Sequence, residues 1–466
     1  MNKTPRYVIL GGGIAGLTAG LELLKRNVEV VILEKNPHVG GLARTIEVDG
    51  FRFDIGGHRF HSNNPQVVAW LKALLGEDLL QVARSSRIFI GGKFVDYPIQ
   101  MPGALGIFPT AQALHMGVSY LQAALTTGPG DDVSFEDWVI RRFGEKVYDA
   151  FFRPYTEKVW GIPCDQLSAD WAVTRIGIPS LWQAIKRSII PYKAPPATAI
   201  SQFYYPRFGF GTISDRIADL ISSQGGQIYT DTELLRIIPE GEQFYIQAQT
   251  GGQPMTFTAD HVVSTLPIPA LLKAIPERLG SHAMLAANPL DYRSLICVFI
   301  MVRKLQISPD HWTYFPGQEI VFGRTHEPKN WSLAMVPDPT MSSLCAEIFT
   351  GPGDSLWQET DDMLAAKTLK DLEKIGWVDP VLVEKTTVVR TRYAYPIFDL
   401  GYAGKLARVT AFLRQWDRLH LVGRTGSFKY MNSDGVIEDV FRFIAQHFPS
   451  GQNPVQPLPE EIGRWA

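Results

Sequence analysis

The sequence has few cysteines and no concentration of positive charge. Its 466 residues include only three cysteines, Cys164, Cys297 and Cys345, and none of them forms a CxxC pair. An odd number of widely spaced cysteines argues against a disulfide framework and predicts a reduced, cytoplasmic setting in which they fill the core. The net charge is −2 and lysine and arginine do not occur in runs, so nucleic acid is not expected as a partner.

Long apolar runs and internal repeats are also missing. The longest apolar run, residues 295–302, is far shorter than the roughly 20 residues that span a bilayer, so it predicts a buried strand and no membrane span. The chain is 45% hydrophobic and 20% charged, as in ordinary globular proteins. Because its length exceeds that of one ordinary core, two or three subdomains are expected.

What the sequence does contain, near its start, is a nucleotide-binding pattern. Residues 7–16 predict a strand, a Gly-x-Gly-x-x-Gly turn at Gly11, Gly13 and Gly16, and the start of a helix. Gly11 makes the turn, Gly13 lets the backbone approach a pyrophosphate, and Gly16 lets the helix pack on the strand. A second apolar run ends at Glu34, which can accept hydrogen bonds from ribose hydroxyls and would repel a 2′-phosphate. The pattern therefore favours FAD or NAD over NADP.

A second glycine pair separates these two cofactors. Gly40 and Gly41 follow Glu34 closely, and FAD proteins of the amine-oxidase and glutathione-reductase type have such a pair where plain NAD dehydrogenases do not. FAD is therefore the expected cofactor. The binding residues expected from these two patterns are Gly11, Gly13, Ile14, Ala15, Gly16, Glu34, Lys35, Gly41 and Leu42.

The order of the predicted elements indicates an α/β fold with a discontinuous Rossmann-type FAD-binding domain. That domain is assigned to residues 1–82, 200–268 and 416–466. A helical subdomain is expected to be inserted at 103–199, where Ser134 and Asp137 predict a capping box. An antiparallel β-sheet substrate subdomain is expected from residues 83–102 and 269–415, with a hairpin at Gly91-Gly92 and strands at 294–302, 310–323, 331–336, 343–349 and 384–396.

A late glycine-led turn predicts another contact with the cofactor. Asp434 and Gly435 precede the apolar helix pattern that begins at Val436. A reduced flavin carries negative charge near its N1 and O2 atoms, and a helix N-terminus directed there would stabilise that charge.

Seven separated motifs resemble those of one family, the UDP-galactopyranose mutases, and in particular its eukaryotic-type branch. The motifs are residues 53–58, 94–100, 152–160 with Arg175, 205–211, 314–316 with Arg324, 392–396 and 423–430. Their order and separations cover nearly the whole chain.

The resemblance implies an isomerase that interconverts the pyranose and furanose forms of a nucleotide sugar, with a UDP-hexose as the expected substrate. In that family, N5 of reduced FAD is thought to attack the anomeric carbon and expel the nucleoside diphosphate. The sugar then recloses through a different hydroxyl, and the diphosphate returns without net redox change. NADPH or NADH is a candidate reductant. The alternative is a net FAD-dependent oxidoreductase of the protoporphyrinogen oxidase, amine oxidase or desaturase type.

The resemblance also assigns roles to single residues. It implies that Arg175 and Arg324 bind the diphosphate, because guanidinium groups can stabilise it as it leaves and hold it for its return. The further residues implied are His58 beside the flavin with Gly56 and Gly57, Arg424 with Gly423 near the reacting atoms, hydroxyls of Tyr314, Tyr395 and Tyr430 at the diphosphate, and Tyr97, Gln100 and Trp160 at the nucleotide end. His58, Arg175, Arg324 and Arg424 are the candidate catalytic residues.

Some positions depart from the family pattern. Thr156 and Ile200 stand where the eukaryotic-type mutases carry asparagines, so a different nucleotide sugar is compatible with the sequence. His58 and His61 form a His-x-x-His pair for which the sequence suggests no third ligand, and no metal site is expected. The sequence leaves open the sugar, the base, the reductant and whether the protein forms a homo-oligomer.

Overall fold

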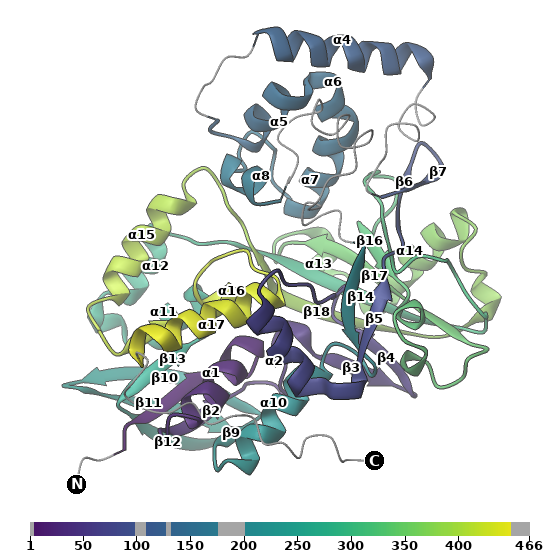
Figure 1. Cartoon of the computed structure of the whole chain (residues 1–466). Coiled ribbons are helices and arrows are strands. Elements are labelled where there is room, and N and C mark those ends of the chain that lie inside the picture. The colour runs from purple at the N-terminus through teal and green to yellow at the C-terminus, as the bar shows by residue number, and fades with distance from the viewer. Residues whose placement is uncertain (1–3, 98–108, 127–131, 176–200, 449–466) are drawn as a thin grey trace.

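The computed structural model describes residues 4–97, 109–126, 132–175 and 201–448. Figure 1 shows three parts: a parallel sheet with its helices at the bottom, a large mixed sheet beside it, and a layer of helices at the top. None of the helices within these ranges combines the length and apolar character needed to cross a membrane.

The parallel sheet draws its strands from three distant stretches of the chain. Its order is β19-β13-β1-β2-β9, and all neighbours run parallel. The strands are β1 (Arg6–Leu10), β2 (Glu29–Leu33), β9 (Gln227–Tyr229), β13 (His261–Ser264) and β19 (Leu419–Leu421). This arrangement confirms the predicted discontinuous Rossmann-type fold.

Both faces of the parallel sheet are covered, as its nearly continuous apolar strands require. Ile9 and Ile32 pack with α1 (Ile14–Leu24), α2 (Pro65–Leu75), α10 (Thr212–Ser223) and α17 (Ser433–His447). Val8 and Val31 face the other way, toward the small sheet of β10 (Thr232–Glu240), β11 (Gln243–Thr250) and β12 (Gln253–Ala259). The helices α11 (Ile268–Ala274) and α15 (Tyr402–Leu413) complete that second layer.

The large sheet has seven strands in the order β18-β14-β17-β16-β15-β6-β7. They are β6 (Ser86–Ile90), β7 (Lys93–Asp96), β14 (Tyr292–Val302), β15 (Trp312–Tyr314), β16 (Arg324–His326), β17 (Ser342–Thr350) and β18 (Val383–Pro396). All neighbours are antiparallel except β15 and β6. Gly91 and Gly92 have φ angles of 59° and 75°, which suit the predicted hairpin turn.

Two of the predicted strands differ from the structure. The prediction at 331–336 is wrong, because the chain there forms the short 3₁₀ turn η6 (Leu333–Met335), which follows a similar turn, η5 (Pro328–Asn330). Asn330 donates to the carbonyls of Ser308 and Asp310, and Ser332 accepts from the Ala334 amide. Such side-chain bonds to the backbone compete with a strand ladder. Of the stretch 310–323, only β15 is a strand.

The helical layer contains α4 (Thr110–Thr126), α5 (Phe135–Phe143), α6 (Glu145–Val147), a π-helical turn η3 (Tyr148–Phe152), α7 (Arg153–Trp160) and α8 (Ala169–Arg175). The capping box at the start of α5 is confirmed, since Ser134 and Asp137 exchange two hydrogen bonds of 3.0 Å. Lys158 holds α7 to the segment after β15, donating to the carbonyls of Phe315, Gly317 and Ile320 at 2.7–2.9 Å.

Shorter elements connect these parts. The two-stranded sheets are β3 (Thr45–Val48) with β4 (Phe51–Asp54), and β5 (Leu79–Ala83) with β8 (Gln202–Pro206). Within the described residues, the remaining helices and turns are η1 (Gly41–Ala43), η2 (Gly76–Asp78), η4 (Glu277–Leu279), α12 (Ser281–Ala287), α13 (Ser355–Gln358), α14 (Asp361–Lys374), η7 (Pro380–Leu382) and α16 (Gly423–Gly426). The predicted subdomain limits near residues 103 and 199 fall outside the described residues and stay predictions.

Candidate active site

The glycines of the first turn are needed for different reasons. A Cβ on Gly16 would lie 2.0 Å from the Gly11 carbonyl oxygen, and one on Gly11 would lie 2.4 Å from Oγ1 of Thr265. These two positions are therefore fixed by the protein's own packing. A Cβ on Gly13 would meet no atom nearer than 3.9 Å. The absence of a side chain at Gly13 is not required by packing, and it leaves open backbone of the kind that a pyrophosphate approaches.

The N-terminus of α1 has the features of an anion-binding site. Its N-cap is Gly13, no side chain caps it, and its first turn has no acidic residue. The first amides of a helix lack partners within the helix and carry partial positive charge, so they suit a phosphate group. Ile14 and Ala15, expected beside the cofactor, form this first turn and are buried.

Glu34 is held at the end of β2. It is buried, its Oε2 accepts from the Gly12 amide at 2.8 Å, and its Oε1 accepts from the Asn36 amide at 2.8 Å. This fixes the carboxylate beside the glycine turn, where a ribose hydroxyl can reach its remaining lone pairs. Lys35, also expected at the cofactor, directs its exposed side chain to Glu233 at 2.7 Å.

Distant segments pack against this turn. The Gly40 amide donates to the Gly12 carbonyl at 2.8 Å, and a Cβ on Gly41 would lie 3.2 Å from the Gly13 Cα. A Cβ on Gly423 would lie 2.5 Å from the Cβ of Ala15. The second glycine pair, with Leu42 in η1, and the start of α16 are thus in direct contact with the first turn. Asp434 and Gly435 lie in the first turn of α17, which begins at Ser433 and not, as expected, at Val436.

Three residues stand in register across the large sheet. Tyr314 on β15 pairs with Arg324 on β16, which pairs with Glu347 on β17. Glu347 is completely buried and accepts from Arg324 twice, from Nε at 2.8 Å and from Nη2 at 2.5 Å. Burial alone would raise the pKa of Glu347, but Arg324 and His326 outweigh it and hold this pKa at about 2. The pair is therefore ionised and bidentate.

Glu347 also connects Arg324 to the residues expected beside the flavin. Its Oε1 accepts from the Gly57 amide at 3.0 Å, and a Cβ on Gly56 would lie 3.2 Å from its Oε2. The next residue, His58, has Nδ1 at 2.9 Å from the Gly56 carbonyl oxygen. Burial lowers the pKa of His58, so its imidazole is neutral with the proton on Nδ1. One carboxylate therefore positions both a guanidinium and the turn that carries this histidine.

Arg424 has buried hydrogen-bond donors that the protein does not satisfy. Its guanidinium carbon lies 4.4 Å from the ring centre of Tyr395 and 4.9 Å from that of Tyr430. The two tyrosine rings are nearly parallel, at 11°. Nε and Nη2 of Arg424 are buried and have no hydrogen-bond partner, while Nη1 lies 3.5 Å from the Met431 carbonyl oxygen. Buried donors without partners are costly and rare, so this position calls for an acceptor from a ligand.

Further aromatic residues surround the two arginines. Tyr155 packs edge-to-face against Tyr314, with ring centres 5.5 Å apart. The ring centres of Tyr314 and Tyr97 are 5.0 Å apart. Burial raises the pKa of Tyr155 well above its usual value, although Arg324 opposes this, and burial likewise raises the pKa of Tyr395. Both phenols therefore stay protonated and can donate. We call the following set the tyrosine–arginine cluster: Tyr155, Tyr314, Arg324, Glu347, Tyr395, Arg424 and Tyr430.

Other predicted site residues lie behind the cluster or cannot be placed. Trp160 is only 2% exposed and packs between Trp171, at 4.4 Å, and Tyr395, at 6.2 Å. It supports Tyr395 from behind, and Thr156 is buried on the same helix. Arg175 ends α8, but its side chain lies outside the described residues, as do Gln100 and Ile200 entirely.

Sequence reasoning missed Glu347 and Tyr155. Glu347 is the one charged residue in the otherwise uncharged, wholly buried strand β17, and a lone acid in such a strand is a usable signal of a buried ion pair. Tyr155 belongs to the motif at 152–160 but carried no role of its own there.

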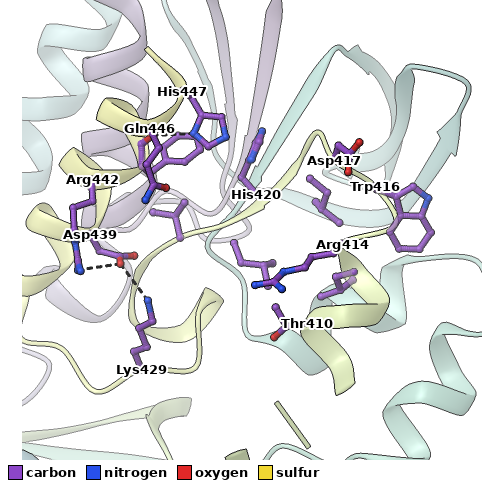
Figure 2. A pocket seen from close by; sticks show the side chains of 15 residues that line it. Thr410, Arg414, Trp416, Asp417, His420, Lys429, Asp439, Arg442, Gln446 and His447 are labelled. Atoms are coloured by element: carbon purple, nitrogen blue, oxygen red, sulfur yellow. Dashed lines mark hydrogen bonds and ion pairs between the residues drawn. The ribbon is translucent and has the colours of Figure 1, made fainter. Parts of the chain in front are cut away.

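A cavity of about 510 Å³ lies elsewhere, at the open edge of the parallel sheet beside β19 and α17. Figure 2 shows Lys429 and Arg442 turned toward Asp439, at 3.5 and 3.3 Å. The charged side chains that line this cavity partly compensate one another, and none of the predicted site residues lines the cavity. Within the part of the chain that the structure describes, no three His, Cys, Asp or Glu side chains gather as a metal site would require.

Known proteins with a similar sequence or fold include an oxidase and UDP-galactopyranose mutases. Coproporphyrinogen III oxidase of Bacillus subtilis is 25% identical over 436 residues, which cover 86% of this chain and 88% of that protein. A "Probable UDP-galactopyranose mutase" of Klebsiella pneumoniae is 23% identical over 165 residues, 35% of this chain and 42% of that protein. The crystal structure of a reduced UDP-galactopyranose mutase superposes with a TM-score of 0.81 at 22% identity, covering 95% of this chain and 96% of that one. It shares the fold.

The model of the family described as flavin containing amine oxidoreductase matches residues 14–438. The flavin that this family implies is FAD, and the residues fit it: the open backbone at Gly13, the uncapped start of α1 and the fixed carboxylate of Glu34. When bound, FAD supplies redox or nucleophilic chemistry that the side chains do not have. The chain belongs to the flavin-containing amine oxidoreductase family.

Proposed function

We propose that the protein is a flavin-dependent mutase that interconverts the pyranose and furanose forms of a nucleotide sugar. The observation that supports this most is Arg424, whose buried Nε and Nη2 lack acceptors between two tyrosine rings. A diphosphate offers the several anionic oxygens that such donors require. The likeness to the fold of a reduced UDP-galactopyranose mutase agrees with this proposal.

In this proposal the tyrosine–arginine cluster holds the nucleoside diphosphate while it is detached from the sugar. Arg324 uses Nε and Nη2 for Glu347, which leaves its Nη1 for the ligand. Arg424 adds two donors, and the protonated phenols of Tyr155 and Tyr395 add two more. The reduced flavin supplies the nucleophile. Fixed donors keep the diphosphate within reach for its return, which raises the effective concentration of the second reactant.

Arg175 and Gln100 enter the proposal from the sequence resemblance alone. Arg175 would bind the diphosphate from the end of α8, and Gln100 would contact the nucleotide with Tyr97. His58 would lie beside the flavin as a neutral imidazole with Nε2 free to accept a proton or hydrogen bond.

A second candidate is a net oxidase acting on a tetrapyrrole. It is favoured by the Bacillus subtilis coproporphyrinogen III oxidase, whose likeness extends over 86% of this chain, against 35% for the Klebsiella protein. The carboxylates of a coproporphyrinogen could also accept from Arg424. The polar, phenol-rich cluster is better suited to a nucleotide diphosphate than to the apolar rings of a tetrapyrrole.

Two reactions run in parallel decide between these functions. Protein reduced with dithionite is incubated without oxygen with UDP-galactose or with other nucleotide sugars, and the products are separated by chromatography. Oxidised protein is incubated in air with coproporphyrinogen III, and hydrogen peroxide and porphyrin fluorescence are recorded. Conversion of a nucleotide sugar only by the reduced protein, without stoichiometric consumption of reductant, supports the mutase. Peroxide-producing turnover of the tetrapyrrole, with no conversion of any nucleotide sugar, overturns it.

A further inference from the structure

One helix presents apolar side chains to the outside of the molecule. On α4, Leu114, Val118, Leu121 and Leu125 are 65%, 52%, 59% and 86% exposed. Their spacing is four, three and four residues. At 3.6 residues per turn, these positions fall within an arc of about 60° and form a single line along the helix. We call this line the α4 seam.

The opposite side of α4 already has its partners. Ala113, Met116, Tyr120 and Ala123 are at least partly buried, and α4 packs on α5 and α6. Figure 1 shows α4 as the outermost element of the helical layer, at the end of the molecule away from the parallel sheet. The seam therefore points away from the rest of the described chain, and none of the described elements covers it.

The sequence around the seam is free of charge. Residues 97–130 contain no Asp, Glu, Lys or Arg, in a chain that is 20% charged overall. Charged residues are depleted at the centres of protein interfaces. Single exposed apolar residues are common on protein surfaces, but a line of four is unusual. Because the seam carries no charge, two copies of it can come together without electrostatic repulsion.

We propose that α4 pairs with α4 of a second copy of this chain, antiparallel about a twofold axis. The alternation of four and three residues is the spacing at which two helices interlock their side chains along a seam. Small residues flank the seam: Ala111 on one side and Gly117 on the other allow close approach. A membrane surface is the poorer occupant, because helices that lie on membranes carry lysine and arginine on their polar face and α4 has neither.

The twofold axis fixes which residues meet. In an antiparallel pair centred on the seam, Leu114 faces Leu125 of the second copy and Val118 faces Leu121. Each contact occurs twice, as in every isologous interface. A helix of 17 residues is only about 25 Å long, so this contact is small and its dimer should depend on protein concentration.

Sedimentation of the FAD-loaded full chain tests the surface. The wild type should shift from monomer toward dimer as its concentration rises, and Leu121→Glu should keep it monomeric over the same range. Val381→Glu, which changes an exposed valine in η7, should leave the dimer intact. Flavin content and the melting temperature of each variant show that it is folded. A wild type that stays monomeric throughout, or a Leu121→Glu variant that dimerises equally well, would overturn the proposal.

Disulfide trapping tests the register. The three native cysteines are buried, so a cysteine introduced on the seam is the reactive one among the described residues. A mixture of Val118→Cys and Leu121→Cys proteins should cross-link under mild oxidation more than either variant alone. Equal cross-linking of the mixture and the single variants would exclude the antiparallel register. Flotation of the wild type with neutral phosphatidylcholine vesicles, lost in Leu121→Glu, would assign the seam to a lipid surface and overturn pairing.

Discussion

The turn around Gly11–Gly16 and the tyrosine–arginine cluster are built in opposite ways. The turn is backbone, its residues are close in sequence, and its carboxylate Glu34 is satisfied by two neighbouring amides. The cluster is made of side chains from β15, β16, β17, β18, α7, α16 and the segment after α16. One of its guanidiniums, Arg324, is paired with Glu347, while Arg424 has buried donors without acceptors. The difference teaches that the two regions offer a ligand different things: the turn leaves backbone open at Gly13, whereas the cluster leaves buried side-chain donors of Arg424 without an acceptor.

The largest effect is expected where the turn depends on its own packing. In Gly16→Val, the new Cβ would lie 2.0 Å from the Gly11 carbonyl oxygen, so α1 could not keep its place on β1 and the protein should not fold. In Gly13→Val, the Cβ is at least 3.9 Å from protein atoms, so the apoprotein should fold but lose FAD. Circular dichroism and the ratio of flavin to protein absorbance measure both. Full FAD occupancy in Gly13→Val would show that the pyrophosphate binds elsewhere.

A smaller loss is expected when the paired arginine loses its partner. Glu347→Gln leaves the guanidinium of Arg324 buried without a compensating charge, which costs about 3–5 kcal/mol of unfolding free energy. Urea denaturation measures this loss. The matched control is Glu384→Gln, which breaks the exposed pair with Arg303 and should cost less than about 1 kcal/mol. Equal effects of the two substitutions would contradict the description of Glu347 as a buried positioning carboxylate.

Replacing Arg424 should reduce ligand affinity more than it reduces stability, the reverse of what is expected for Glu347. Arg424→Met removes donors that have no protein partner, so stability should change little. UDP affinity should fall about ten- to hundredfold, because a hydrogen bond from a charged group is worth roughly 1.5–3 kcal/mol. Lysine should restore little, since it lacks the planar fork.

Titration calorimetry of both Arg424 variants gives the affinities. Arg414→Met, in the cavity of Figure 2, is the control and should bind UDP like the wild type. If Arg424→Met also bound UDP unchanged, the nucleotide would not lie on this guanidinium.

At neutral pH the smallest effect is expected at the outer edge of the parallel sheet, where the change appears only on acidification. His261 and His420 lie 3.2 Å apart between ring nitrogens. Burial and neighbouring cations lower the pKa of His261 to about 4, and burial with His447 and His261 lowers that of His420 to about 3. Both are lowered from the ordinary value near 6.5, so the unfolded chain binds more protons and stability falls as pH drops from about 6.5 toward 4.

Replacing His420 by glutamine should flatten this acid-side decline. The measurement is the urea midpoint at a series of pH values between 7 and 4. An unchanged slope would mean that other groups cause the decline.

The same contrast explains what the sequence could predict. The glycine turn, Glu34, the hairpin at Gly91 and the capping box at Ser134 follow from short-range patterns, and the structure has them where they were expected. Residues 331–336 were misassigned because side-chain bonds from Asn330 to a neighbouring segment override strand propensity. The role of Glu347 was not predicted, because it depends on the pairing of β17 with β16, and local sequence does not show which strands pair. The motif resemblance predicted that Arg324, Arg424, Tyr395 and Tyr430 lie near one another. It did not predict which of the two arginines is paired with a carboxylate.

The discontinuous parallel sheet also sets the order of events during synthesis. β2 ends at Leu33, but β19, which completes the sheet, begins only at Leu419, and the apolar face of α1 packs on α17 after that. At translation rates of about 5–20 residues per second, roughly 20–80 seconds separate these segments. For that time the face of α1 that packs on α17 has no partner, although β9, α10 and β13 can join β1, β2 and α1 earlier. The protein should therefore depend on chaperones that hold early segments, and pauses in translation between residues 33 and 419 should lower its yield.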